Sequence, residues 1–417
     1  MFKLLAEDGN ARNGILKTPH GEIETPFFMP VASKAVGRFV STDDYKHANA
    51  KAIISNAFLL SQDPGLEMFE KMGGIHNFMH FNDIIFTDCG GFQMLRENLL
   101  QGTTNNGIRF KNPQGQEVFI RPKTVMDIGK KIGGDVIMAL DCVLPYGRSR
   151  EEYLEALAKS HRWTKQCKEL HDSEQLLFGI TQGGTFEDLR IASAKEIDAM
   201  DFDGNAIGGL GIGEPSQVAY KIIEVSVPHL DKNKPRYVMG VGKPEQILEY
   251  VERGIDIFDS IYPQKNARHG MLFTFEGIRD LGQAQYKYDE KPIEKTCDCF
   301  TCKNFSRSYV RYLLKKEDPV GKRYLTIHNL FFMQEFMKRI RESIRYGTFQ
   351  EWKKEFLESF ISDIIDTAIL ENFISDIIDT AIVENFVESV ITAGIADLFV
   401  EDLWTEFQNK SQIMETF

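Results

Sequence analysis

The chain has 417 residues, 42% of them hydrophobic and 26% charged, with a formal net charge of −12 and six cysteines. This length and composition indicate a soluble protein with a sizeable core, and so few cysteines exclude a disulfide scaffold. The N-terminus has no long apolar segment and no stretch is long enough to span a bilayer, so we expect a cytoplasmic protein without a membrane partner.

The negative charge is concentrated near the end of the chain. Residues 360–417 contain twelve Asp or Glu and one Lys, whereas residues 1–359 contain 49 acidic and 48 basic residues. Residues 297–347 carry eleven Lys or Arg against five Asp or Glu. A basic face of this kind could bind phosphates, so the net charge does not exclude a nucleic-acid partner; a solvated helix surface explains it equally well.

Short apolar runs recur through the first 260 residues, and helical patterns such as residues 149–171 separate several of them. This alternation predicts a parallel sheet covered by helices. Because polar and acidic residues follow many runs and no GxGxxG fingerprint is present, a (β/α)8 barrel is favoured over a doubly wound sheet. Residues 14–30 predict a hairpin that turns at His20-Gly21 before the barrel begins. The runs are AIISNAF (52–58), DIIFTD (83–88), DVIMALD (135–141), LLFGITQGG (176–184), NAIGGLGIG (205–213), RYVMGVG (236–242) and GIDIFDS (254–260).

Three cysteines lie within six residues, at Cys297, Cys299 and Cys302. His328, in TIHNL, is the expected fourth ligand, although a lone histidine is more often an ordinary core or surface residue. Four ligands of this kind form a closed tetrahedral zinc site that leaves no position for a substrate. We therefore predict one structural Zn²⁺ per chain.

A tandem repeat follows the zinc segment. SDIIDTAILENFI (362–374) is followed directly by SDIIDTAIVENFV (375–387). Thirteen residues of α-helix fall about 140° short of four turns, so equivalent apolar residues would not share one face of a straight helix. We expect either separate short helices packed against the barrel or a second subunit, or a tolerated duplication at a chain end.

Three acids stand at the ends of predicted strands: Asp88, Asp141 and Asp259. A single Asp at such a position is most often a helix N-cap. Three together predict that their side chains meet at the mouth of the barrel, which is the opening at the C-terminal ends of its strands. Gln182 and the glycine-rich residues 208–211 add amide groups that can read the edge of a flat heterocycle. A carboxylate nucleophile with a second acid suits displacement at the anomeric carbon of a sugar.

Seven segments resemble, in order and spacing, the motifs of queuine tRNA-ribosyltransferases, also called tRNA-guanine transglycosylases. The resemblance covers roughly residues 8–347. It implies an irregular (β/α)8 TIM barrel over residues 1–347, with a zinc-binding subdomain at about 290–347. The acidic residues 348–417 lie outside the resemblance, and we expect them to form a helical extension with 13-residue repeats. The segments are FTDCGGFQ, MALDCVLPY, LFGITQGG, AIGGLGIGEP, RYVMGVGKPE, GIDIFDSIYPQKNARHG and CDCFTCKNFSRSYVRYL with TIHNL.

The resemblance also implies roles for individual residues. The family exchanges the wobble guanine of tRNAs with a GUN anticodon for a 7-deazaguanine. Asp259 matches the covalent nucleophile and Asp88 the general acid/base. The base-reading positions are Asp141, Gln182, Gly209 and Leu210, with Cys89 helping to hold the base; Met239 and Phe92 match residues that sandwich it, and Lys243, Lys265 and Arg268 match cations around the anticodon loop.

The incoming base stays open between preQ1 and queuine. Val143 stands where preQ1-using enzymes typically carry Cys, which favours queuine, whereas Ile212 is bulky where eukaryotic queuine enzymes have Gly. Cys89 and Cys142 also depart from the bacterial pattern, which has Ser and Glu there. We expect a homodimer. The alternatives are a non-catalytic partner subunit of a heterodimeric transglycosylase, and an archaeal or DNA-type enzyme that inserts preQ0.

Overall fold

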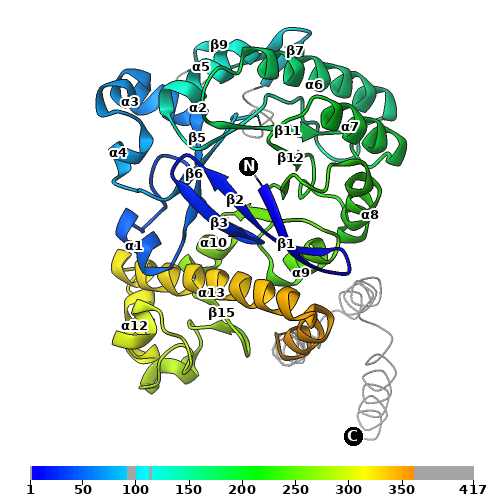
Figure 1. Cartoon of the computed structure of the whole chain (residues 1–417). Coiled ribbons are helices and arrows are strands. Elements are labelled where there is room, and N and C mark those ends of the chain that lie inside the picture. Colours follow the sequence, from blue (N-terminus) through cyan, green and yellow to red (C-terminus); the bar gives the residue numbers. More distant parts are fainter. Residues whose placement is uncertain (1, 92–99, 112–114, 361–417) are drawn as a thin grey trace, which may run out of the picture.

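The computed structural model describes residues 2–91, 100–111 and 115–360, and its centre is a ring of eight parallel strands (Figure 1). The isolated bridge between Val31 and Ile54, with Ala32 N–H donating to Ile54 O at 2.8 Å, joins the first and last strands. The predicted (β/α)8 barrel is therefore confirmed. In spatial order the strands are β4 (Phe27–Pro30), β14 (Ile257–Ser260), β13 (Arg236–Val238), β12 (Gly204–Ile207), β11 (Leu176–Thr181), β10 (Val136–Met138), β6 (Ile84–Asp88) and β5 (Ala52–Asn56).

All seven predicted apolar runs contain a barrel strand, and the eighth strand was hidden in the predicted hairpin. That hairpin exists as β2 (Ala11–Thr18) and β3 (Gly21–Thr25), but its two-residue turn is Pro19-His20, one position earlier than predicted. The FFMP segment that follows is not part of it. It forms β4, which pairs in parallel with β14.

Helices and small sheets surround the ring. Residues 150–170 illustrate how local sequence sets the boundaries: Ser149 and Glu152 form a reciprocal capping box at the start of this helix. The helices are α1 (Thr42–His47), α2 (Ala57–Leu60), α3 (Leu66–Met72), α4 (Ile75–Met79), α5 (Pro122–Ile132), α6 (Arg150–Leu170), α7 (Glu187–Ala199), α8 (Ser216–Ser226), α9 (Pro244–Glu252), α10 (Tyr262–Arg268), α11 (Phe300–Asn304), α12 (Arg307–Lys315) and α13 (Pro319–Tyr346). The small antiparallel sheets are β7 (Leu100–Thr104), β8 (Gly107–Lys111) and β9 (Glu117–Ile120), and β15 (Met271–Thr274) with β16 (Gly277–Asp280).

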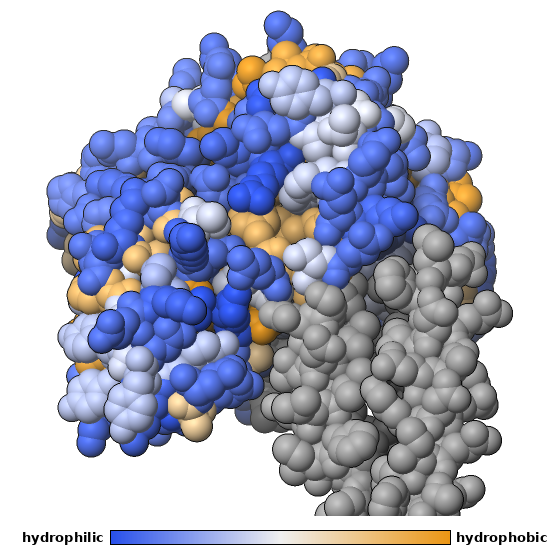
Figure 2. Space-filling view, turned by 90° about the horizontal axis from the view of Figure 1, so that it is seen from below, coloured by the Kyte–Doolittle hydropathy of each residue, from blue (hydrophilic) through white to orange (hydrophobic). Residues whose placement is uncertain are grey.

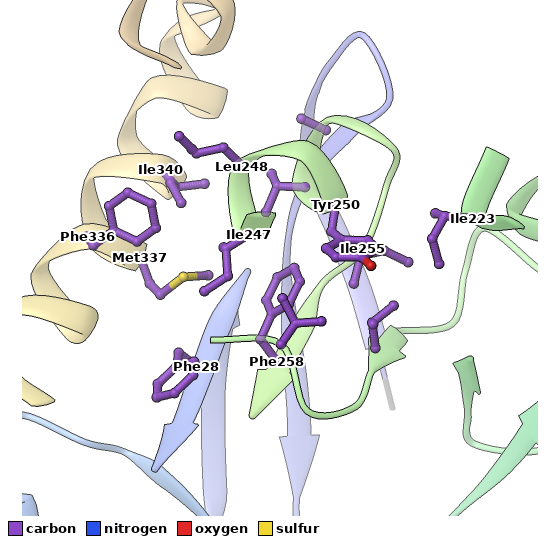
Figure 3. Packing of buried hydrophobic residues seen from close by; sticks show 14 of the residues in the cluster. Phe28, Ile223, Ile247, Leu248, Tyr250, Ile255, Phe258, Phe336, Met337 and Ile340 are labelled. Carbon is purple, nitrogen blue, oxygen red and sulfur yellow. The ribbon is translucent and has the colours of Figure 1, made fainter. Parts of the chain in front are cut away.

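The barrel is filled with side chains. Phe86 lies edge-on to Phe27, Phe178 and Tyr237, with ring centroids 5.7 to 6.2 Å apart. A second core lies outside the strands, where α9 and α13 pack over Phe28 and Phe258 (Figure 3). The rigid strands thus fix where the residues at their ends are placed.

The N-terminal sheet of β1 (Phe2–Asp8), β2 and β3 covers the N-terminal ends of the barrel strands (Figure 1). The Arg12 guanidinium on β2 bonds both oxygens of buried Asp256, at 3.2 and 2.6 Å. Buried Asp135 accepts the His20 backbone N–H at 2.8 Å and lies 3.2 Å from His76 Nε2. Burial alone would raise the pKa of Asp135, but hydrogen bonds from His76 and the backbone outweigh it and lower that pKa.

The chain continues after α13 into a helix over residues 349–360, whose Phe349, Phe356 and Phe360 are buried in the same outer core as α13. Residues 361–417, which include both 13-residue repeats, lie outside the described residues. The division of the chain near residue 347 stays a prediction. Within the described ranges, no helix combines the length and apolar character required to cross a membrane.

Candidate active site and metal centre

The three predicted acids gather at the C-terminal ends of the barrel strands. Asp88 ends β6, Asp259 lies in β14, and Asp141 follows β10 by three residues. The charge on Asp259 raises the pKa of Asp88, and Cys89 Sγ lies 3.8 Å from Asp141 Oδ1. The structure therefore brings the three carboxyl groups into one mouth, where burial raises the pKa of each.

One carboxylate oxygen of Asp259 accepts two hydrogen bonds. The Tyr237 hydroxyl donates to Oδ1 at 2.5 Å, and Gly240 N–H donates to the same atom at 3.0 Å. Burial raises the pKa of Asp259, while these two donors favour its ionised form and oppose the rise. Because both donors bond Oδ1, the second oxygen is the one available for chemistry.

The carboxyl group of Asp88 has a pKa close to neutral pH. Burial, with a smaller contribution from the charge on Asp259, raises its pKa to about 7, against the opposing effect of its hydrogen bonds. Asn56 Nδ2 donates to Oδ2 at 2.9 Å, and Gly90 N–H donates to Oδ1 at 3.1 Å. A carboxyl group with such a pKa can both give and accept a proton at physiological pH.

Asp141 and Gln182 form a buried polar pair. Gln182 Nε2 donates to Asp141 Oδ2 at 2.6 Å, and burial raises the pKa of Asp141 to about 6. Gly209 has a φ of +68°, and a Cβ there would lie 2.5 Å from Gln182 Oε1. Glycine is thus required both by the backbone conformation and by the close approach of Gln182.

Of the remaining predicted base contacts, Cys89 lies against this pair, with its Sγ 3.8 Å from Asp141 Oδ1. Leu210 is buried, and Met239 is partly buried against the core inside the barrel. Cys89 is also buried, and burial raises the pKa of its thiol. Phe92 lies outside the described residues, so its predicted role is untested.

The three predicted cations border the same end of the barrel. Lys243 is the N-cap residue of α9 after β13, and Lys265 and Arg268 lie on α10 after β14. Both lysines are exposed and Arg268 is half-buried. Burial lowers the pKa of Arg268, and the neighbouring positive charge of Arg38 lowers it further.

The basic segment found in the sequence is largely engaged within the protein. Its face is hydrophilic with separate apolar areas (Figure 2). Arg339 stacks on Phe275, with Cζ 3.5 Å from the ring centroid. This pattern favours the solvated, ion-paired interpretation for much of residues 297–347. The ion pairs are Lys303–Asp298, Arg307–Asp289, Arg323–Asp44, Lys338–Glu335, Arg341–Glu24 and Arg345–Glu24.

Cys297, Cys299, Cys302 and His328 form a cluster that could hold a metal ion. His328 Nδ1 lies 3.7, 3.6 and 3.4 Å from the three Sγ atoms in that order. Tetrahedral bonds of the lengths that zinc makes to sulfur and nitrogen separate these atoms by about 3.6 Å. His328 Nε2 lies 2.9 Å from Phe273 O, which fixes the ring with Nδ1 toward the sulfurs.

In a second group, His20, His76 and Asp135, three possible ligand atoms lie within 4.8 Å of one another. The two imidazole rings are stacked, with centroids 3.5 Å apart and planes at 19°. One ion could not lie in both ring planes in this arrangement. These residues form a hydrogen-bonded clamp between the N-terminal hairpin and the barrel.

Three residues of the mouth were not singled out from the sequence: Tyr237, Asn56 and Arg190. Tyr237 and Asn56 stand in strand segments that were recognised, but their partners are far away in the chain. Arg190 lies on α7, is fully buried, and donates to three glycine carbonyl groups. The sequence gives one sign that the Arg190 side chain faces inward: it lies three residues before Ser193 on the same helix, and Ser193 is also buried.

The chain is similar in sequence to proteins of known family. Residues 8–362 match the family described as queuine tRNA-ribosyltransferase. The chain belongs to this family. The queuine tRNA-ribosyltransferase of Desulforamulus reducens is 42% identical over 352 residues, covering 84% of this chain and 95% of the relative. Those of Pelotomaculum thermopropionicum and Francisella tularensis subsp. novicida are 42% and 40% identical over 359 and 361 residues, each covering 86% of this chain and 97% and 98% of the relative.

The metal cluster of this queuine tRNA-ribosyltransferase family member gives a first prediction. The purified protein should contain about one zinc per chain, and Cys302→Ala should lose most of it, because three ligands hold zinc far less tightly than four. Elemental analysis by mass spectrometry measures this ratio.

Cys167→Ala is the matched control, because Cys167 is buried on α6 and outside the cluster. It should retain the metal. Zinc-free wild-type protein that remains folded would refute the assignment.

Proposed function

We propose that the protein is a tRNA-guanine transglycosylase of queuosine modification, which exchanges the wobble guanine of tRNAs with a GUN anticodon for a 7-deazaguanine. The observation that carries this proposal is the pair of half-buried carboxyl groups in one mouth: Asp259, held for attack by Tyr237 and Gly240, and Asp88, whose pKa is about 7. Family membership supplies the substrate class.

The proposed reaction has two displacement steps. In the first, the second oxygen of Asp259 attacks ribose C1′, the bond from C1′ to guanine N9 breaks, and protonated Asp88 gives its proton to the departing base. In the second, ionised Asp88 takes a proton from the incoming base, whose nitrogen attacks C1′ and releases Asp259. Asp88 is ionised after the first step and protonated again after the second. A carboxyl group with a pKa near neutrality can adopt both forms.

The base would be recognised by the polar layer beside these acids. Asp141 and Gln182 offer acceptors and donors for the heterocycle edge, and Gly209 and Leu210 offer backbone groups. Met239 and Phe92 would enclose the ring from its two faces. Cys89 would line the pocket, and the base could be preQ1 or queuine, since Val143 and Ile212 favour different answers.

The tRNA would approach over the cations at the mouth. Lys243, Lys265 and Arg268 would hold phosphates around the extruded wobble nucleotide, because RNA loops are read through splayed bases and backbone charge. Zinc in the Cys3His cluster would stabilise the fold next to α10 and supply no catalytic step. We further propose a cytoplasmic homodimer.

The alternative of a non-catalytic partner subunit explains the site less well. Such a subunit has no need of Asp88, Asp141 and Asp259 together with their donors Asn56 and Tyr237. Buried carboxyl groups with raised pKa values are costly to maintain and cluster at functional sites. The archaeal or DNA-type alternative differs in the base inserted and in the nucleic acid used, so substrate assays separate it.

The second prediction concerns the nucleophile. Asp259→Asn should reduce exchange of radiolabelled guanine into tRNA by at least about 10³-fold, because an amide cannot form the glycosyl ester. Binding of tRNA should change little, since the cations of the mouth are untouched. Filter binding and initial exchange rates measure the two effects.

Asp201→Asn serves as the control, because Asp201 is exposed and pairs with Lys234 away from the mouth. Its exchange rate should equal that of the wild type. Ordinary turnover by Asp259→Asn would rule out the covalent mechanism.

The third prediction concerns pH. The exchange rate should show an apparent pKa near 7 that belongs to Asp88. Asn56→Ser removes the amide donor that favours the ionised carboxylate but keeps a good N-cap for α2, so the apparent pKa should rise by roughly 0.5 to 1 unit.

Rate profiles from pH 5 to 9 for both proteins measure the shift. Ser61→Ala is a control at the other end of α2, because the Ser61 hydroxyl donates to Phe58 O and accepts from Gln62 Nε2, and neither bond involves Asp88. A downward shift in Asn56→Ser, or none, would contradict the assignment of this pKa to Asp88.

A further inference from the structure

Arg190 is a buried cation without a carboxylate partner among the described residues. Its side chain is 0% exposed, and burial lowers its pKa to about 10. The acceptors of its guanidinium are backbone carbonyl groups: Gly184 O from Nε at 2.7 Å, Gly208 O from Nη1 at 2.8 Å and Gly209 O from Nη2 at 3.4 Å. Since an unpaired buried charge is costly, the arrangement of these carbonyl groups needs a reason.

The bonds of Arg190 determine which way two peptide groups face. In a planar trans peptide, the C=O and the following N–H point in opposite directions. When Arg190 draws the carbonyl groups of Gly208 and Gly209 toward itself, the N–H groups of Gly209 and Leu210 are directed away from it. The Gln182 side chain comes close to Gly209 and donates to Asp141.

The same helix also holds the end of β11. Ser193, one turn after Arg190 on α7, accepts the backbone N–H of Gln182 through its hydroxyl at 3.0 Å. Arg190 and Ser193 thus fix the strand ends β11 and β12 from beneath the mouth. Gly208 and Gly209 cannot be replaced without a clash, since a Cβ on either would lie within 2.7 Å of the Gln182 side chain.

We propose that Arg190 is a positioning residue for base specificity, which aims the N–H groups of Gly209 and Leu210 at the carbonyl oxygen of the purine-like base. This inference rests on the proposed function and deepens it. Two parallel N–H donors suit a carbonyl acceptor such as O6 of guanine and repel an amino group at that position, as in adenine. Arg190 itself touches no substrate.

The test compares Arg190→Lys with wild type, using radiolabelled guanine and tRNA as the two varied substrates. Lysine keeps the charge but cannot bond three carbonyl groups with a planar fork. We expect the KM for guanine to rise about 10- to 100-fold, while the KM for tRNA stays within about threefold. A general structural defect would change both.

Arg190→Ala provides a second measurement if the lysine variant behaves ambiguously. Guanidinium chloride at low, non-denaturing concentration should refill the vacated space and restore part of the guanine affinity, whereas equal urea or sodium chloride should not. Arg236→Lys is the matched control, since Arg236 is buried, bonds the carbonyl groups of Leu230 and Gly254, and lies at the N-terminal end of β13.

The outcomes separate this inference from the proposed function. If wild-type protein exchanges guanine and folded Arg190→Lys has an unchanged KM for guanine, the role of Arg190 is refuted and the enzyme assignment stands. Parallel loss of affinity for guanine and tRNA, matched by Arg236→Lys, would also refute it. If the wild type itself neither binds guanine nor exchanges it, the proposed function fails.

Discussion

The barrel imposes one constraint from which its chemistry follows: the carboxyl ends of eight parallel strands meet at a single mouth, where carboxyl groups are partly removed from solvent. Residues far apart in the chain, such as Asp88 and Asp259, are forced together there. Loss of hydration raises the pKa values of their carboxyl groups, and each group responds differently because its hydrogen-bond donors differ. Two chemically equal side chains thereby acquire the separate tasks that we propose, nucleophile and proton carrier.

At the opposite end of the barrel, aspartates have a structural role. Asp135 and Asp256 precede their strands, and each is bonded to the N-terminal sheet, Asp256 through Arg12. These acids are saturated with donors and seal the barrel. Asp259, in contrast, has its two donors on one oxygen, which leaves the other exposed to a reacting atom.

The strands and the acids could be predicted from the sequence because both depend on the local pattern of apolar and acidic residues. An apolar run followed by an acid marks a strand end wherever it occurs, and three closely spaced cysteines mark a metal site. Tyr237, Asn56 and Arg190 were missed because their importance comes only from partners brought near by folding. The strand β4 was missed for a simpler reason: four apolar residues directly after a hairpin carry no boundary of their own. For the basic segment, the sequence left two interpretations open, and the structure favours the solvated surface, since many of its charges pair with acids elsewhere in the chain.

The central feature of the proposed mechanism is a covalent bond between Asp259 and the ribose. The most direct measurement is peptide mapping of the complex formed between the wild-type protein and an anticodon stem-loop, trapped by denaturation during turnover. We predict that mass spectrometry finds the ribonucleotide adduct on the peptide of residues 254–265 and that fragmentation places it on Asp259, not on Asp256. An adduct on any other residue, or turnover with no adduct at all, would contradict the account.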